Sequence, residues 1–353
     1  MRILVAMSGG VDSSVAAATM VERGHEVIGV TLKQWSGPDG RLPTAGCCTV
    51  ADAEDARRVA AKLGIPYYVL DYRDRFAESV VAHFTSEYLA GRTPNPCIEC
   101  NRRVRFGALL SRAAELGCDR LATGHHARVD HDGTRYRLLV GRDRDKDQSY
   151  VLHMLGQGEL ASILLPIGEM TKTEVRAEAA RLGLRTATKA DSQDLCFVAG
   201  DYREFLRERL PQAARPGPIV DATGTVVGSH RGTADFTIGQ RKGLGVSFGE
   251  PRYVVGVDAA TSTVTIGRRE ELAVEACLVT GVSFISGGAP EEGAEVAVKI
   301  RYRSAAVAAT LWTENGGRRV RFSEPQLAVS PGQAAVFYRG DEVLGGGTIE
   351  EAA

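Results

Sequence analysis

Apolar residues in about the first 200 positions follow two alternating patterns. Short continuous runs rich in Val, Ile and Leu are typical of buried parallel strands, and apolar positions three or four apart are typical of amphipathic helices. The strands expected from the runs are 2–6, 25–32, 67–70 and 120–123. The helices expected between them are 13–22, a stretch from Thr49 to Gly64, 74–89 and 104–116. This order predicts an α/β fold with a parallel, doubly wound sheet and ligands at the carboxyl ends of its strands.

Helical periodicity disappears after about residue 215, where short segments of alternating polarity begin. Segments 217–220, 226–228, 253–257 and 263–266 predict a small β-rich domain. Segments 296–300, 306–311, 318–322, 335–338 and 342–344 predict a six-stranded or similar β-barrel. We therefore expect three domains, at 1–210, 211–273 and 274–353.

Length and charge limit the classes of protein to consider. The 353 residues exceed what one core usually supports, which agrees with several domains. Because 43 basic residues face 44 acidic ones, a nucleic-acid surface would have to be a local basic patch. The first expected strand leaves no room for a secretion signal, and no apolar run reaches the length of a membrane span. These features predict a cytoplasmic protein that does not bind membranes.

The run SGGVDSS at positions 8–14 connects the first expected strand to the first helix. Glycines allow successive backbone N–H groups to point into one concavity, and the helix N-terminus adds positive partial charge, so the turn predicts a phosphate site. It lacks the lysine of the common GxxxxGK[ST] loop. The run resembles the signature loop of the PP-loop ATP pyrophosphatases, which split ATP into AMP and pyrophosphate. That resemblance implies a nucleotide-binding domain of the adenine nucleotide alpha-hydrolase type.

Seven cysteines are unevenly spaced, at Cys47, Cys48, Cys97, Cys100, Cys118, Cys196 and Cys277. Their odd number in a reducing compartment argues for reactive thiols or metal ligands and against a disulfide framework. Cys97 and Cys100 form a CxxC pair after Pro94 and Pro96, and we expect an irregular loop that displays both thiols. The spacing alone allows a redox pair, half of a zinc site or a catalytic thiol, although two further zinc ligands at comparable spacing are absent from the sequence.

Five motifs occur together in one order: SGGVDSS at 8–14, NPCIECN at 95–101, KDQSY at 146–150, SQDLCF at 192–197 and FTIGQRKG at 236–243. In this combination the chain resembles the tRNA-specific 2-thiouridylases, from Met1 to about Gly346. The resemblance implies ATP-dependent sulfur transfer to C2 of the wobble uridine, at position 34 of a tRNA, through adenylation of O2. The implied tRNAs carry anticodons of the Lys, Glu and Gln types.

The resemblance also implies a role for each matching residue. Cys196 would carry a persulfide, received from a sulfur-relay protein or a cysteine desulfurase, and Cys100 would be its partner thiol. The implied ATP-binding residues are Ala6, Met7, Ser8, Gly9, Gly10, Val11, Asp12, Ser13, Leu32 and Gly124. The implied tRNA-contacting residues are Asn95, Pro96, Cys97, Lys146, Asp147, Gln148, Arg301 and Tyr302. Mg²⁺ should bridge the phosphates, with Asp12 as a catalytic residue that contributes to it.

Other interpretations remain open at this level. Some relatives have aspartate at the position of Cys97, so Cys97, Cys100 and Cys196 could instead hold a [4Fe-4S] cluster with one open iron. A PP-loop synthetase acting on a small carbonyl substrate would share the Ser8 loop without needing Cys100 and Cys196. An RNA-binding protein without catalysis would explain the barrel and leave SGGVDSS unused. The sulfur donor and the oligomeric state cannot be inferred from the sequence.

Overall fold

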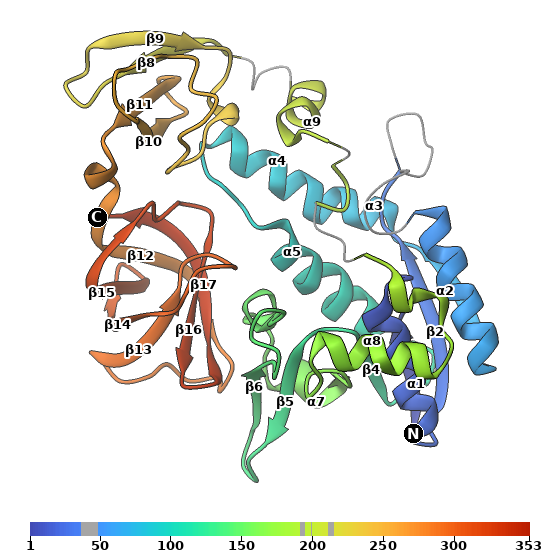
Figure 1. Ribbon diagram of the computed structural model, residues 1–353. Coiled ribbons are helices and arrows are strands. Elements are labelled where there is room, and N and C mark those ends of the chain that lie inside the picture. The colour runs from blue at the N-terminus through green and yellow to red at the C-terminus, as the bar shows by residue number, and fades with distance from the viewer. Residues whose placement is uncertain (37–48, 191–194, 199, 211–214) are drawn as a thin grey trace.

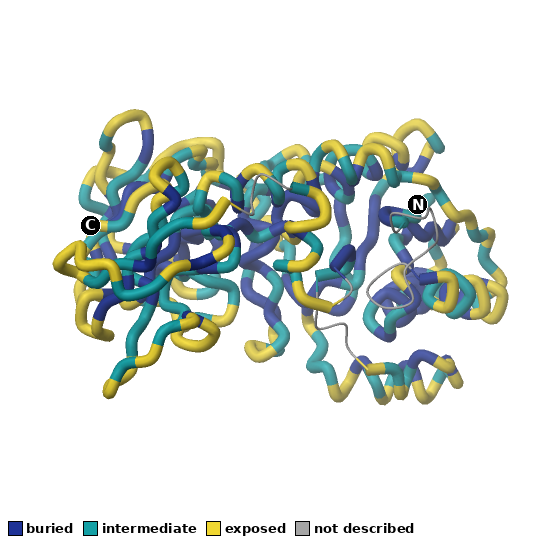
Figure 2. The backbone as a smooth tube through the Cα atoms, turned by 90° about the horizontal axis from the view of Figure 1, so that it is seen from above, coloured by how far each residue is buried: buried dark blue, intermediate teal, exposed yellow. Residues whose placement is uncertain are grey.

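The computed structural model describes residues 1–36, 49–190, 195–198, 200–210 and 215–353. Three sheets lie side by side: a parallel sheet with its helices, a small β sheet near one end of α4, and a barrel that contains the C-terminus (Figure 1). Seen from above, the molecule is elongated, with the C-terminus in one half, the N-terminus in the other, and buried segments in both (Figure 2). None of the helices in the described part of the chain is long and apolar enough to cross a membrane.

The parallel sheet has five strands in the order β3-β2-β1-β4-β7. Their bounds are Arg2–Ala6 (β1), Glu26–Lys33 (β2), Tyr67–Asp71 (β3), Arg120–Thr123 (β4) and Ile163–Leu164 (β7). Side chains of β1 alternate between two cores, because Leu4 packs into one cluster while Ile3 and Val5 pack into the other. The predicted parallel sheet with helices on both faces is confirmed, and the short strand β7 is an addition to it.

Helices cover both faces of this sheet. The face of the sheet that carries the Ile3 side chain is covered by α1 (Val11–Glu22), α2 (Val50–Leu63) and α8 (Lys172–Arg181). The opposite face is covered by two long helical segments and by α9 (Tyr202–Arg209). The first long segment comprises α3 (Arg73–Phe76), η1 (Ala77–Val81) and α4 (Ala82–Leu89), and the second comprises α5 (Pro96–Glu99), η2 (Cys100–Leu109) and α6 (Leu110–Glu115). Shorter helices are η3 (Ser149–Leu152), α7 (Gln157–Ser162) and η4 (Arg185–Thr188).

Local sequence explains several helix ends. Thr49 and Asp52 form the reciprocal capping box at the start of α2, as their spacing predicts. Helix α1 begins at Val11, two residues before the expected start, because Gly10 takes the N-cap position. Cys97 and Cys100 lie in helical turns, so the expected irregular loop at this point is wrong. Asn95 is the N-cap of α5 and Pro96 is its first residue, where proline needs no N–H donor.

The two smaller units are built from antiparallel strands, apart from one parallel pair. The small sheet has the order β10-β11-β8-β9 and comprises Gly217–Val220 (β8), Val226–His230 (β9), Tyr253–Asp258 (β10) and Thr263–Gly267 (β11). The barrel comprises Ala273–Phe284 (β12), Ala294–Lys299 (β13), Val307–Glu314 (β14), Gly317–Leu327 (β15), Ala334–Arg339 (β16) and Glu342–Ala352 (β17). Pairing of β12 with β17 and β15 closes it. The expected six-stranded barrel is therefore confirmed, although the sequence pattern did not identify β12.

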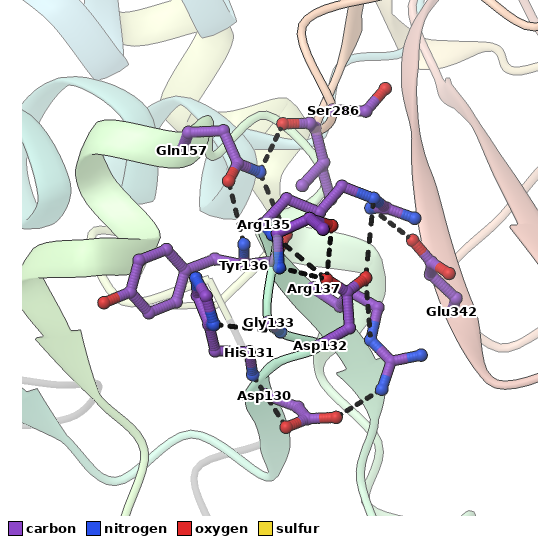
Figure 3. Close-up of polar contacts among 12 residues, drawn as sticks. Asp130, His131, Asp132, Gly133, Arg135, Tyr136, Arg137, Gln157, Ser286 and Glu342 are labelled. Atoms are coloured by element: carbon purple, nitrogen blue, oxygen red, sulfur yellow. Dashed lines mark hydrogen bonds and ion pairs between the residues drawn. The ribbon is translucent and has the colours of Figure 1, made fainter.

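A hairpin that the sequence pattern missed joins the first unit to the barrel. Strands β5 (Ala127–His131) and β6 (Tyr136–Val140) continue the barrel sheet, because β6 pairs with the start of β17. At the hairpin tip, Arg135 forms an ion pair of 2.7 Å with Glu342, and the Gln157 amide donates hydrogen bonds to the carbonyl oxygens of Tyr136 and Ile285 (Figure 3). The barrel is therefore attached to the parallel-sheet unit by continuous backbone pairing as well as by side chains.

Candidate functional site

The loop between β1 and α1 lies at the carboxyl edge of the parallel sheet. Met7, the first residue of this loop, is hydrogen-bonded to β2. Its N–H donates to Val30 O at 2.7 Å, and its carbonyl accepts from Thr31 Oγ1 at 2.6 Å. Helix α1 then starts with an N-cap that has no side-chain hydrogen bond, so backbone N–H groups of its first turn are not capped by a side chain. This is the arrangement that binds phosphate at a helix N-terminus.

Gly9 and Ser13 give the loop its shape. Gly9 has φ +73°, and a Cβ atom there would lie 2.1 Å from the carbonyl oxygen of Asp52, so no other residue fits without a shift of backbone. Gly10 is extended and does not need this freedom. The Ser13 hydroxyl accepts from Ser8 N–H at 3.1 Å and lies 3.2 Å from Gly10 O, to which it donates. The hydroxyl of Ser13 therefore stabilises the curvature that the phosphates require.

Gly124 and Leu32 flank this loop in different ways. Gly124 follows β4, and a Cβ atom there would lie 2.6 Å from the backbone nitrogen of Ser13. A glycine is thus required where the turn after β4 touches the first turn of α1. Leu32 is 7% exposed near the end of β2 and packs into the apolar core of the sheet.

Asp12 is held by two cationic or polar groups from distant segments. Lys172 Nζ lies 2.8 Å from both carboxylate oxygens of Asp12, and His126 Nε2 lies 3.3 Å from Oδ1. Burial raises the pKa of Asp12, but the hydrogen bonds from His126 and Lys172 outweigh burial and hold that pKa below its ordinary value. The carboxylate is therefore charged at neutral pH and faces an ammonium group.

A second lysine holds the loop from its carbonyl side. Lys189 Nζ donates to Gly9 O at 3.0 Å and contacts Asp52 Oδ1 and Asp55 Oδ2, each at 2.7 Å. These contacts tie the loop to the start of α2. They also tie it to the segment that leads toward Cys196.

His126 belongs to a polar chain that continues toward the barrel. The Gln148 side chain accepts from His126 N–H at 2.9 Å. The neighbouring Asp147 is buried, accepts from the N–H groups of Gly141 and Ser149, and lies 3.6 Å from Lys299 of β13. The predicted tRNA residues Asp147 and Gln148 thus make contacts within the protein, whereas the neighbouring Lys146 is partly exposed.

The CxxC segment is anchored at its start to the barrel. Thr93 N–H donates to Pro331 O at 2.8 Å, and Thr93 O accepts from Gln333 Nε2 at 2.7 Å. Asn95 Oδ1 then accepts from Cys97 N–H at 3.1 Å as the cap of α5. Cys97 is exposed, while Cys100, one helical turn later, is buried. The helix therefore points the two thiols into different surroundings.

Two neighbouring residues after β2 connect the surroundings of Cys100 and Cys196. Gln34 Nε2 donates to Cys100 Sγ at 3.4 Å. The adjacent Trp35 ring packs edge-on against Phe197, with 6.1 Å between ring centroids, and Phe197 directly follows Cys196. Cys100 belongs to the apolar core cluster that contains Trp35 and Phe197, and Cys196 packs against it. The structure thus brings both predicted thiols to one cluster, with Cys196 only partly buried.

The three thiols do not form a metal site. Among the described residues, no group of three His, Cys, Asp or Glu side chains comes together in a way that could hold a metal ion. Cys97, Cys100 and Cys196 therefore do not fit the ligand set of a [4Fe-4S] cluster in this arrangement. Cys47 and Cys48 lie outside the described residues, as do the first four residues of the DSQDLCF segment, 191–194.

The loop between β13 and β14 carries Arg301 and Tyr302, and Tyr302 lies within electrostatic range of Cys97. Burial raises the pKa of the Tyr302 phenol, and negative charge on Asp147 and Cys97 raises it further, because these side chains are neighbours. The Tyr302 ring also packs 5.9 Å from the Tyr150 ring. Arg301 is half-buried and donates to Ala328 O. Tyr302 and Cys97 therefore lie close enough to interact electrostatically, although about 200 residues separate them in the sequence.

Sequence reasoning missed four residues that the structure adds to this region: Gln34, His126, Lys172 and Lys189. Two adjacent histidines, His125 and His126, follow Gly124 in the sequence, and His126 is the one that contacts Asp12. Lys172 follows Thr171, whose spacing to Glu174 is the capping-box signal. That signal could have located the helix start, but nothing in the local pattern indicates which loop the lysine contacts.

Three family models match consecutive parts of the chain. They are described as a tRNA methyl transferase HUP domain (residues 1–200), a tRNA methyl transferase PRC-barrel domain (203–268) and an aminomethyltransferase beta-barrel domain (274–349). The chain is 51% identical to a tRNA-specific 2-thiouridylase MnmA of Roseiflexus sp. (strain RS-1), over 99% of both chains. It is also 51% identical to one of Moorella thermoacetica, again over 99% of both.

A solved 4-thiouridine synthetase in complex with RNA and ATP is more distant. It aligns with a TM-score of 0.36 and 18% identity, over 60% of this chain and 50% of that one. Similarity at this level supports no functional conclusion.

Proposed function

Because the chain belongs to the family of tRNA-specific 2-thiouridylases, we propose that the Ser8 loop and the thiols of Cys196 and Cys100 act on one uridine. The enzyme is an ATP-dependent tRNA sulfurtransferase that converts the wobble uridine to 2-thiouridine. The C2 oxygen of uridine is a poor leaving group, whereas the same oxygen leaves readily as part of AMP. The chemistry thus needs an adenylating site and a sulfur site within reach of one base.

The uncapped start of α1 supports a nucleotide site at residues 6–13, with Leu32 and Gly124 beside it. In this proposal, backbone N–H groups of the loop bind the phosphates, and uridine O2 attacks the α-phosphorus. Both oxygens of Asp12 face Lys172, so Asp12 in this arrangement is placed to bind an ammonium group and not Mg²⁺. We therefore treat Mg²⁺ as the counter-ion that ATP brings and route no step through a metal held by the protein.

The observation that carries the proposed sulfur chemistry is the Gln34–Trp35 pair, which contacts Cys100 and Phe197 and so brings two distant thiols to one cluster. Cys196 is the more accessible of the two, which suits a thiol that must accept sulfur from another protein. In this proposal Cys196 carries a persulfide whose terminal sulfur attacks C2, and AMP leaves with the former O2. The Cys100 thiolate then attacks Sγ of Cys196, which breaks the sulfur–sulfur bond, leaves the outer sulfur on the base and forms a Cys100–Cys196 disulfide that an external thiol reduces before the next turnover. A sulfur-relay protein or a cysteine desulfurase would supply the persulfide.

The neighbouring positions of Tyr302 and Cys97 support an RNA site between the barrel and the CxxC helix. An aromatic ring and an exposed helix start can receive a base that has left its stack, as the unpaired wobble base can. We assign Asn95, Pro96 and Cys97 to the base pocket, and Lys146 and Arg301 to the RNA backbone. Asp147 and Gln148 would act by positioning this region, because both make contacts within the protein. Domains at 1–210, 211–273 and 274–353 remain our working division.

Pyrophosphate release and thiolation, measured separately on the full-length enzyme, test this proposal. We expect pyrophosphate release from ATP to require tRNA, and thiolation to require a persulfide donor as well. Cys97→Ser should keep most of the thiolation activity under aerobic conditions, because the proposed persulfide route does not need that thiol. Joint loss of bound iron and activity in Cys97→Ser would instead support the cluster mechanism. Pyrophosphate release with a small carbonyl acid and without tRNA would contradict the proposed substrate.

A further inference from the structure

We propose that Lys172 binds the phosphates of ATP and supplies the positive charge that the Ser8 loop lacks, while Asp12 holds its ammonium group in place before ATP binds. This inference rests on the proposed function in one respect, that ATP binds at this loop. It goes further by assigning a binding residue from a helix about 160 positions away in the sequence.

The backbone of Lys172 is firmly held. It is the first residue of α8 and lies within the capping box that Thr171 and Glu174 form. Its own N–H donates to Asp143 Oδ2 at 2.8 Å. A lysine with an anchored backbone keeps its ammonium group within a small volume, and here that volume lies at the first turn of α1.

Charge at the loop also favours a phosphate-binding role. Asp12 is the only acidic residue within positions 6–14, and it stands in the first turn of the helix whose N-terminus should bind an anion. A charged carboxylate there would repel ATP unless a cation balanced it. Lys172 balances it, with its side chain 12% exposed and that of Asp12 29% exposed. The pair is shielded, and shielding strengthens the attraction of an ammonium group for phosphate.

Lys189, the other lysine at the loop, is unsuited to this role. It contacts two carboxylates, Asp52 and Asp55, so the charge of this group remains negative. It also approaches the loop from the carbonyl oxygen of Gly9, whereas phosphates bind the N–H side. Lys189 therefore acts as a support for the loop, and of the two lysines that the described residues place at it, Lys172 is the one that fits a nucleotide-binding role.

The contribution of Lys172 to the reaction follows from the charges. Uridine O2 attacks the α-phosphorus, the bond from this phosphorus to the bridging oxygen breaks, and its electron pair leaves with pyrophosphate, while the N3 proton passes to water. Negative charge grows on the departing pyrophosphate. An ammonium group beside the loop stabilises that charge most where it is greatest, in the transition state.

A double-mutant cycle on the full-length enzyme tests the assignment. Lys172→Met should weaken ATP binding about 10- to 100-fold by calorimetry and lower tRNA-dependent pyrophosphate release further, since a hydrogen bond between charged groups is lost. Lys172→Arg should recover part of both. In the Asp12→Asn background, where the carboxylate needs no neutralising partner, Lys172→Met should still weaken ATP binding.

The same cycle can overturn the proposal. If Lys172→Met has no effect on ATP binding in the Asp12→Asn background, the lysine only neutralises Asp12. The double variant leaves no unpaired buried charge, so it keeps the test valid even if Lys172→Met alone folds poorly. Lys62→Met is the matched control, because the Lys62 ammonium group donates to the carbonyl of Gly183 and does not contact Asp12. This variant should bind ATP like the wild type. If the wild-type enzyme releases no pyrophosphate with tRNA, the proposed function fails instead.

Discussion

The nucleotide end and the sulfur end of this enzyme lie at the same sheet but are built in opposite ways. The Ser8 loop is held by hydrogen bonds and charges: Ser13 shapes it, and Lys172 and Lys189 approach it from two sides. Cys100 instead is buried in the apolar cluster that also contains the aromatic side chains of Trp35 and Phe197. One end is polar and prepared for an anion, and the other surrounds the Cys100 thiol with apolar side chains.

This difference fits what each end must handle. ATP arrives with its charge already present, so the loop needs fixed donors and cations that require no rearrangement. Cys100 is buried in the apolar cluster, whereas Cys196, the proposed persulfide carrier, packs against its edge and is partly exposed, which suits a thiol that must receive sulfur from a donor. His125 stands between the two ends, because it follows Gly124 at the loop and its ring lies 5.8 Å from that of Phe106 on the Cys100 helix.

The largest expected effect comes from separating the two ends through Cys196. Cys196→Ser should lower thiolation by at least about 1,000-fold, because a hydroxyl cannot carry a persulfide, while tRNA-dependent pyrophosphate release stays within a few fold. Thiolated tRNA is measured by mass spectrometry of nucleosides, and pyrophosphate by a coupled assay. Cys277→Ala is the control, because burial raises the pKa of that barrel thiol to about 12. Equal loss of both activities in Cys196→Ser would mean that the ends do not act separately.

The next effect concerns the loop itself. Ser13→Ala removes the hydroxyl that accepts from Ser8 N–H and donates to Gly10 O, and we expect pyrophosphate release to fall about 10- to 100-fold. Affinity for tRNA, measured by filter binding, should stay within about twofold. Ser14→Ala removes a buried hydroxyl that donates to the same Gly10 carbonyl at 2.8 Å, and its effect should be smaller. A larger effect of Ser14→Ala would show that the Gly10 carbonyl, not the Ser8 contact, controls the loop.

The same contrast explains what sequence could predict. The shape of the Ser8 loop could be anticipated because Ser8, Gly9 and Ser13 lie within a few residues of one another, and their contacts depend on backbone geometry over that short range. The contact of Lys172 with Asp12 could not be predicted, because the local sequence around a lysine at a helix start does not indicate which distant loop it contacts. The hairpin at 127–140 was missed because its strands are short and its tip is polar, and its partner strand β17 is about 200 residues away.

The thiol region shows a different kind of error. The sequence located Cys100 and Cys196 by motif, but the expected loop around Cys100 is a helix, since Asn95 caps it and Pro96 occupies its first position. Asn95 and Pro96 are themselves a helix-start signal, although the two prolines taken alone favour the irregular loop that we expected. By contrast, the proximity of Tyr302 to Cys97 depends on how the barrel packs against the first unit, which no local pattern contains.

Lower pH should reduce the stability of the folded protein through His125, which lies between the two ends. Burial lowers the pKa of this buried imidazole to about 3, against about 6.5 in an unfolded chain. The unfolded state thus binds a proton that the folded state does not, so stability is full above pH 6.5 and is lost as pH falls toward 3. Between pH 8 and pH 5 the loss should be about 2 kcal/mol.

Urea unfolding at the two pH values, compared between the wild type and His125→Asn, measures this contribution. Asparagine keeps an oxygen near the Thr123 hydroxyl that contacts Nδ1 at 2.8 Å, but it cannot titrate. The variant should lose less stability on acidification than the wild type. Buried His153, whose pKa is lowered to about 4, remains in both proteins and contributes equally. An identical pH dependence in both would place the titration elsewhere.

The smallest effect is expected at the RNA surface, where single charges are screened. Lys146→Ala should weaken binding of every cognate tRNA about fivefold at physiological salt and reduce the log–log salt slope by about one, because one phosphate contact is lost. Arg144→Ala is the comparison variant, since it removes another positive charge only two residues away, on a guanidinium that pairs with Asp341 at 2.6 Å. Its salt slope should stay close to that of the wild type. Equal changes in both variants would indicate that tRNA responds to the overall positive charge of this segment. A change confined to Lys146→Ala would place the RNA backbone at Lys146, between the Ser8 loop and the barrel.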